Sequence, residues 1–147
     1  MKSVTNNFKK IHIGLFIRQR VEETNIEMSR ICNFLKCTEE ELENMYLSKS
    51  LDSEILLRWS KLLKYDFFRI YTQHLLLYAP PSRDSNKVAI ENEKTVMPQF
   101  RKNIYTKEVI DFILEIIETR EKTKQQVIDE YKIPKTTLFT WIRKYQK

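Results

Sequence analysis

Glycine is nearly absent from this sequence, which has one glycine in 147 residues. Hairpin-rich sheets and phosphate-binding glycine loops both depend on glycine, so neither is expected. The two cysteines, Cys32 and Cys37, lack the CxxC spacing of zinc sites, and only His12 and His74 are available as further ligands. We therefore expect two reduced thiols, no bound metal and no cofactor.

The sequence also lacks long apolar segments. No run approaches the roughly 20 apolar residues that cross a bilayer, and residues 1–10 are too polar for a secretory signal. Hydrophobic residues still make up 41% of the chain, with eight Phe and seven Tyr to fill packed cores. These features predict an all-α protein without a membrane span, located in the cytoplasm.

Apolar residues recur at helical spacing through the first half of the chain and predict five short helices. Thr38 and Glu41 form a candidate capping box, and Asp52 or Ser53, then Asp66, are candidate caps of later helices. The single Gly14 lies inside the first predicted helix, which favours close approach of another helix. The expected inward residues are Ile13, Phe16, Ile17, Val21, Met28, Ile31, Cys32, Leu35, Leu42, Met45, Tyr46, Leu56, Trp59, Leu62, Leu63, Phe67, Phe68, Ile70, Tyr71 and Leu75.

Several landmarks of this region follow the order found in one family of regulators. They are Ile13-Gly14, Ile31-Cys32, Leu35 to Thr38, Ser50-Leu51-Asp52 and Asp66-Phe67-Phe68. Residues 11–75 thereby resemble the phage-repressor (XRE-type) helix-turn-helix fold, with Lys36 at the family's turn glycine. The resemblance implies a five-helix, repressor-like domain over residues 1–78. It also implies that the helix from Thr38 to Leu47 enters the major groove.

The outward residues of that helix are unusually acidic. They are Glu40, Glu41, Glu43 and Asn44, preceded by Glu39. Carboxylates repel the phosphates that supply most DNA affinity. A glutamate can nevertheless accept a hydrogen bond from cytosine N4. Two interpretations therefore stay open for residues 1–78. One is a second set of DNA contacts, with Glu40, Asn44 and Lys49 as candidates, and the other is a homodimer or protein-partner interface.

The second half of the chain divides into a linker and a small helical domain. Residues 79–104 contain Pro80-Pro81 and lack clear periodicity, which is typical of a linker. Residues 105–147 predict three helices, with Thr106 capping the first and Thr123 with Gln126 forming a capping box on the second. Pro134 is expected at the first position of the third helix. The apolar face of that helix is Leu138, Trp141, Ile142 and Tyr145.

The end of the chain concentrates positive charge, because no acidic residue follows Glu130. The run from Val127 to Trp141 combines an apolar residue and proline, a basic residue, Thr-Leu and a later aromatic. It resembles the homeodomain-like helix-turn-helix of insertion-sequence transposases and pipsqueak-type proteins, which bind DNA. The candidate DNA contacts are Lys132, Lys135, Thr136, Thr137, Thr140, Arg143, Lys144 and Lys147.

The net charge of +6 is spread along the chain, so the placement of the basic residues is more informative than their number. Arg143 is a candidate for bidentate contact with guanine, and Lys144 and Lys147 for phosphate. We expect a non-enzymatic protein that binds double-stranded DNA, either a transcriptional regulator or the DNA-recognition subunit of a transposition system. The alternative is an adaptor whose acidic N-terminal domain binds another protein.

Overall fold

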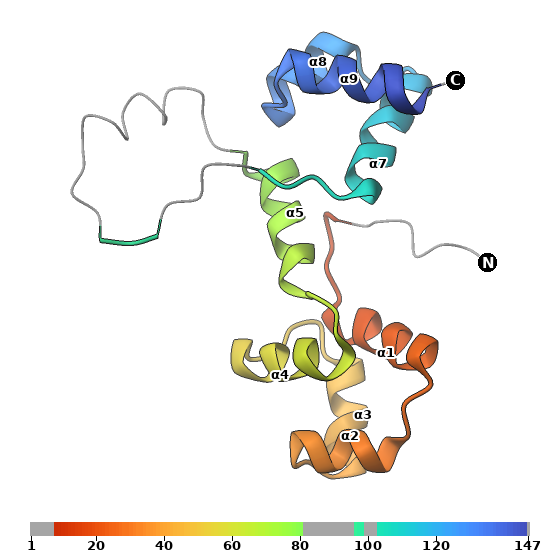
Figure 1. The fold of residues 1–147 in the computed structure, drawn as a ribbon, viewed down its shortest axis with the longest axis vertical. Helices are drawn as coiled ribbons and strands as arrows, with labels where there is room; N and C mark the ends of the chain where they lie inside the picture. The colour runs from red at the N-terminus through yellow and green to blue at the C-terminus, as the bar shows by residue number, and fades with distance from the viewer. Residues whose placement is uncertain (1–7, 81–95, 99–102, 147) are drawn as a thin grey trace. The chain divides into compact units, whose positions relative to one another are not determined.

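The computed structural model describes residues 8–80, 96–98 and 103–146, and all regular secondary structure in these ranges is helical. The all-α prediction is confirmed. Most of the predicted linker 79–104 lies outside the described residues, as does Lys147. The helices in Figure 1 are α1 (Ile13–Thr24), α2 (Met28–Leu35), α3 (Glu39–Leu47), α4 (Ser53–Leu63), α5 (Phe68–Tyr78), α7 (Lys107–Glu118), α8 (Lys124–Tyr131) and α9 (Lys135–Tyr145).

The chain forms two compact units, and their boundary falls inside α5. The N-terminal unit ends at Thr72 and the C-terminal unit begins at Gln73, whereas the sequence analysis places the end of the first domain at residue 78. No helix in the described part of the chain is long and apolar enough to cross a bilayer. The core of the N-terminal unit consists of Ile13, Ile17, Ile31, Leu35, Leu42, Tyr46, Leu56, Trp59, Leu63, Phe67 and Ile70.

The single glycine allows α1 to approach the end of α3 closely. The backbone N–H groups of Ile13 and Gly14 donate to the carbonyl oxygens of Lys49 and Ser48, at 3.0 and 3.1 Å. A Cβ atom on Gly14 would lie 2.4 Å from the carbonyl oxygen of Tyr46. The prediction of a close helix approach at Gly14 is confirmed, and the partner is the backbone of α3.

Most helices begin at the polar residues that the sequence marks as caps. Both capping boxes form: the Thr38 hydroxyl accepts from Glu41 N at 3.2 Å and the Glu41 carboxylate accepts from Thr38 N at 2.8 Å. Thr123 and Gln126 repeat this pair of bonds at 3.2 and 2.8 Å. Single side-chain caps are provided by Asp52, Asp66 and Thr106.

Two residues expected in the core are exposed instead. Met28 is 41% exposed at the start of α2, and Leu75 is 57% exposed in α5. The second half of α5 turns Gln73 inward, where its amide donates to Ile104 O at 2.8 Å and accepts from Thr106 N at 3.3 Å. These bonds tie the segment before α7 to α5 within the C-terminal unit. Gln73 is the one buried polar side chain among the described residues.

Left-handed backbone positions in the described chain are taken by residues with side chains. Lys36 (φ 56°), Lys64 (φ 49°) and Lys132 (φ 55°) each follow the last residue of a helix, and Asn25 and Arg120 also have positive φ. Glycine is the usual residue at such helix ends because a Cβ atom makes this conformation costly. The turn after α2 therefore forms with lysine at the position where the resemblance implies glycine.

Replacing Lys36 or Lys64 by glycine should raise the free energy of unfolding of the N-terminal unit by roughly 0.5–1 kcal/mol for each change. The gain comes from removing the strained Cβ contact and is partly offset by the greater freedom of glycine in the unfolded chain. Urea unfolding followed by Trp59 fluorescence, in a Trp141→Phe background, measures this unit alone. Lys61→Gly, inside α4, is the control and should lower the free energy by about 1 kcal/mol.

Candidate nucleic-acid interface

The candidate site is built on α8, a three-residue turn and α9. Helix α8 has eight residues and ends at Tyr131, and Lys132 then takes a left-handed conformation with φ 55° and ψ 30°. Ile133 is 1% exposed and anchors the turn in the core. Pro134 follows with φ −58° and ψ 136° and is the N-cap of α9, so it lies one position before the predicted first helical position.

One side of α9 holds the helix in its unit. Leu138 is fully buried and Trp141 is 7% exposed. The Trp141 ring meets the Tyr105 ring edge-on, with centroids 5.0 Å apart. Trp141 is thus a core anchor, as the sequence analysis favours. Tyr145, expected on the same apolar face, is 42% exposed, because it is the last residue of the helix.

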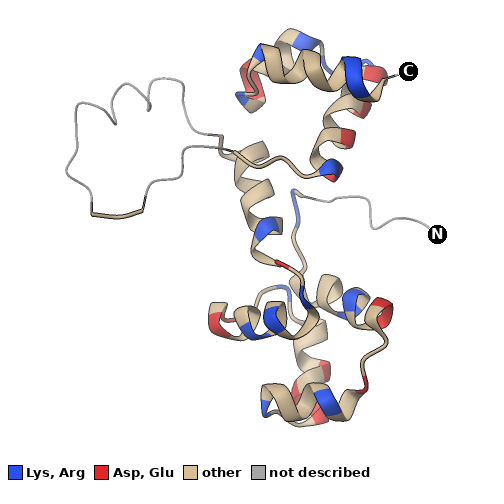
Figure 2. Cartoon of the chain, viewed as in Figure 1, with Lys and Arg blue, Asp and Glu red and all other residues tan. Residues whose placement is uncertain are grey.

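The opposite side of α9 is exposed and carries most of the predicted contacts. Lys135, Thr136, Thr140, Arg143 and Lys144 are exposed, while Lys132 and Thr137 are half-buried. Their helical spacing places Thr136, Thr140 and Arg143 in one line, with Lys135 and Lys144 on its two flanks. We call these five residues the basic row. Figure 2 shows basic segments near both ends of α9 and no acidic segment along it.

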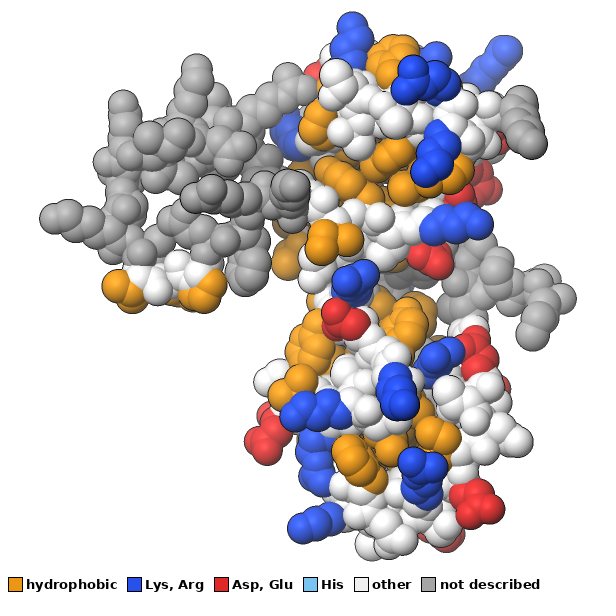
Figure 3. Space-filling model, in the orientation of Figure 1, with side chains coloured by type: hydrophobic (Ala, Val, Ile, Leu, Met, Phe, Trp, Pro, Cys, Tyr) orange, Lys and Arg blue, Asp and Glu red, His pale blue; other side chains and the backbone are white. Residues whose placement is uncertain are grey.

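The cations of α9 are not neutralised by ion pairs. Among the described residues, the four ion pairs are Arg18–Glu22, Arg20–Glu23, Arg69–Asp66 and Lys122–Glu130. None of them involves α9, so the charges of Lys135, Arg143 and Lys144 are available to a ligand. Figure 3 shows basic side chains spread over the α8 and α9 region of the molecule.

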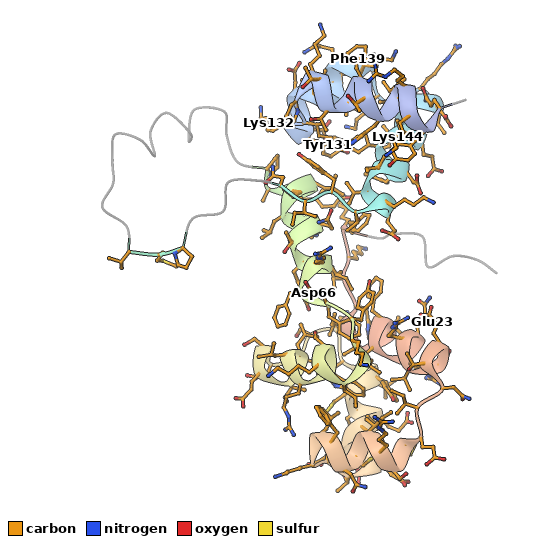
Figure 4. The ribbon with its side chains drawn as sticks, in the orientation of Figure 1. Glu23, Asp66, Tyr131, Lys132, Phe139 and Lys144 are labelled. Carbon is orange, nitrogen blue, oxygen red and sulfur yellow. The ribbon has the colours of Figure 1, made fainter. Side chains whose placement is uncertain are left out.

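An exposed aromatic ring lies within the basic row. Phe139 is 43% exposed, and the ammonium nitrogens of Lys124 and Lys135 lie 5.6 and 5.8 Å from its ring centroid. Neither Phe139 nor Lys124 is among the contacts predicted from the sequence. Their proximity was detectable only from the fold, because Lys124 belongs to α8. Figure 4 labels Phe139 on α9, with Lys132 and Lys144 toward opposite ends of this helix.

The N-terminus of α9 has free donors. Pro134 provides no side-chain cap, and the first backbone bond into the helix runs from Leu138 N to Pro134 O at 3.0 Å. The N–H groups of the first turn therefore have no acceptor within the helix. Together with the helix dipole they favour an anion at this end, next to Lys135.

The N-terminal unit contains the same local geometry. Helix α2 also has eight residues, and Lys36 takes a left-handed conformation before α3 begins three residues later. Three buried positions correspond. Ile31 and Leu35 of α2 match Val127 and Tyr131 of α8, and Leu42 of α3 matches Leu138 of α9.

The exposed faces of these two motifs have opposite chemistry. Glu39 and Leu47 of α3 occupy the positions of Lys135 and Arg143 in α9. The remaining exposed residues predicted on the α3 side are Glu40, Glu41, Glu43, Asn44 and Lys49. The Glu41 carboxylate is engaged by the backbone of Thr38, and Leu47 is 70% exposed. The α3 face is therefore acidic with an apolar end.

The thiols and the acids that the structure describes do not assemble into a metal site. No group of three or more His, Cys, Asp or Glu side chains in the described ranges is placed to hold a metal ion. Both cysteines are free and half-buried. Burial, reinforced by neighbouring Cys32, raises the pKa of the Cys37 thiol above its ordinary value. Cys37 is therefore protonated at neutral pH, whereas metals and electrophiles react with the thiolate.

The chain was compared with known proteins at the level of families, sequences and folds. No family model, curated protein or solved structure matches it.

Proposed function

We propose that this protein binds double-stranded DNA through α9, as a non-enzymatic regulator or as the DNA-recognition subunit of a transposition system. The observation that supports this most is the unpaired basic row of α9, opposite the buried Leu138 and Trp141. A helix fixed on one side and cationic on the other can lie in the major groove of a duplex. We place the protein in the bacterial cytoplasm, associated with the nucleoid.

The proposed contacts divide by position along α9. Lys135 and the free N–H groups of the first turn bind phosphate, as does Lys144 on the other flank. Thr136, Thr140 and Arg143 face the base edges, and Arg143 is suited to guanine because its guanidinium donates two parallel hydrogen bonds. Lys132 and Thr137, which are half-buried, have a supporting role at the turn. Phosphate contacts set the register and base contacts provide the sequence preference.

A different role is proposed for the N-terminal unit. Its α3 follows the same kind of left-handed turn as α9, but it has Glu39 at the position of Lys135 and an otherwise acidic exposed side. Phosphate would repel this face, so we assign the N-terminal unit to a protein partner or a second copy of the chain. The exposed Leu47 gives that face an apolar contact point. In this assignment DNA affinity resides in the C-terminal unit.

The function is tested by the binding of a mixed-sequence duplex at several salt concentrations, measured by fluorescence anisotropy. We expect the logarithm of affinity to fall linearly with the logarithm of salt, by about 0.9 for each phosphate contacted. Lys135→Glu should lower the affinity about tenfold, because it removes an attraction and adds a repulsion. The absence of salt-dependent binding by the full chain would refute the proposal.

Lys107→Glu is the matched control for Lys135→Glu. Lys107 is the first residue of α7, as Lys135 is of α9, and both side chains are exposed. Each change alters the net charge by the same amount and puts a carboxylate at a helix N-terminus, where the dipole favours it. We expect Lys107→Glu to retain nearly the affinity of the unmodified chain. Equal losses in the two variants would indicate an effect of total charge and not of α9.

A further inference from the structure

The centre of the basic row of α9 is mostly uncharged. Between the flanking lysines it presents Thr136, Phe139, Thr140 and Arg143, of which Arg143 alone is charged. Phe139 exposes 43% of its surface although Leu138 and Trp141 already provide the buried side of the helix. An exposed phenyl ring in a basic row is suited to an apolar feature of the ligand.

The hydroxyl of Thr140 is directed at the helix itself. It donates to the backbone oxygen of Thr136 at 2.8 Å. Its proton is therefore not available to a base edge, and the part of Thr140 free to contact a ligand is its methyl group with the oxygen lone pairs. This residue thus extends the hydrocarbon surface that Phe139 begins.

Two lysines place positive charge beside the hydrocarbon surface of Phe139. The ammonium nitrogens of Lys124 and Lys135 lie 5.6 and 5.8 Å from the ring centroid. If these cations bind phosphates on the rim of a groove, the exposed ring beside them is brought to that groove. The single methyl group displayed on base edges in the major groove of ordinary DNA is that of thymine at C5.

We infer that Phe139 and the methyl groups of Thr136 and Thr140 bind thymine C5-methyl groups, so that the preferred duplex contains thymine beside the guanine read by Arg143. This inference rests on the proposed DNA-binding function and specifies its ligand. The methyl contacts add selectivity without a hydrogen bond, because apolar surfaces of protein and base are removed from water together.

The test uses pairs of duplexes that differ only in thymine methyl groups. The tightest-binding members of a random-sequence duplex pool are selected and then resynthesised with deoxyuridine in place of thymidine. This removes the methyl groups and keeps every hydrogen-bonding group of the base edges. We expect the full chain to bind the uracil duplexes roughly fourfold more weakly for each contacted methyl group lost.

Variants of the chain show which residues distinguish thymine from uracil. In Phe139→Ala and in the double variant Thr136→Ser, Thr140→Ser, the ratio of thymine to uracil affinities should fall toward one. Thr119→Ser is the matched control, because Thr119 is also exposed and its hydroxyl donates to Glu115 O at 2.9 Å. The control should keep the full ratio. Trp141 fluorescence checks that each variant retains a folded C-terminal unit.

The outcomes separate this inference from the function on which it rests. Salt-dependent binding with equal affinity for thymine and uracil duplexes overturns the inference and leaves DNA binding intact. Failure to bind either duplex overturns the proposed function. A thymine preference that survives Phe139→Ala and the double serine variant overturns the assignment to α9. A preference that is lost in these variants and kept in Thr119→Ser supports it.

Discussion

Gly14→Ala should lower the free energy of unfolding of the N-terminal unit by about 3 kcal/mol or more. The new Cβ atom would lie 2.4, 2.5 and 2.7 Å from the carbonyl oxygens of Tyr46, Met45 and Ser48. All three are backbone atoms at the end of α3, so no side chain can rotate to relieve the overlap. Helix α1 would have to move away from α3.

That movement has a second cost. The N–H groups of Ile13 and Gly14 would separate from the carbonyl oxygens of Lys49 and Ser48, leaving polar groups unpaired at a buried contact. Ile13 and Ile17, which are fully buried, would lose packing as well. Small domains are stable by only about 5–15 kcal/mol, so the variant should unfold at a much lower urea concentration.

The measurement is urea unfolding with Trp59 as the reporter, in a chain that carries Trp141→Phe. Trp59 is fully buried in the N-terminal unit, so its emission follows that unit alone. Leu15→Ala is the control, because Leu15 neighbours Gly14 and is 54% exposed. It should change the stability by less than about 0.5 kcal/mol. An unchanged midpoint for Gly14→Ala would show that α1 does not depend on this close approach.

The beginnings of helices were predictable from the sequence because their determinants are local. The bonds of Thr38 with Glu41 and of Thr123 with Gln126 join residues three apart. Such pairs can be recognised without knowledge of the rest of the chain. A close helix contact at Gly14 was predictable, because glycine is unfavourable inside a helix unless another element approaches it closely. The identity of that element, α3, was not predictable.

The face of α5 was not predictable from one periodic pattern. Ile70 is buried in the N-terminal core, while Gln73, Leu76 and Leu77 are buried in the C-terminal unit. The first part of α5 therefore packs in one unit and the second part in the other. Leu75 is buried in neither. A pattern rule that assigns one inward face to one helix places Leu75 in the core for that reason.

The correspondence between the two helix-turn-helix motifs was also hidden in the sequence. Leu42 and Leu138 are identical, but the other matched buried positions differ in residue type, as Leu35 and Tyr131 illustrate. The left-handed turn residues are Lys36 and Lys132, and lysine at these positions does not mark a turn in a sequence. The backbone conformation reveals that the motifs match although most of their residues, buried and exposed, differ.

Arg143→Ala should lower affinity for the preferred duplex roughly 5- to 150-fold, because a bidentate contact to a base discriminates by about 1–3 kcal/mol. Its effect on non-specific duplex should be much smaller, since the contact depends on guanine. Lys135→Ala should behave differently, weakening all duplexes to a similar degree and reducing the salt slope by about 1. Anisotropy titrations on the selected duplex and on a mixed-sequence duplex distinguish these two patterns.

The difference between the effects of Arg143→Ala and Lys135→Ala on affinity is more informative than the size of either loss. Both side chains are exposed on α9 and neither belongs to the core, so the helical signal and Trp141 fluorescence should match those of the unmodified chain. Arg143→Lys keeps the charge and loses the planar pair of donors, so it should retain the salt slope and lose the sequence preference. A preference that survives both Arg143 variants would place base recognition elsewhere. Unaltered binding after the combined loss of Arg143 and Lys135 would mean that α9 is not the helix that contacts DNA.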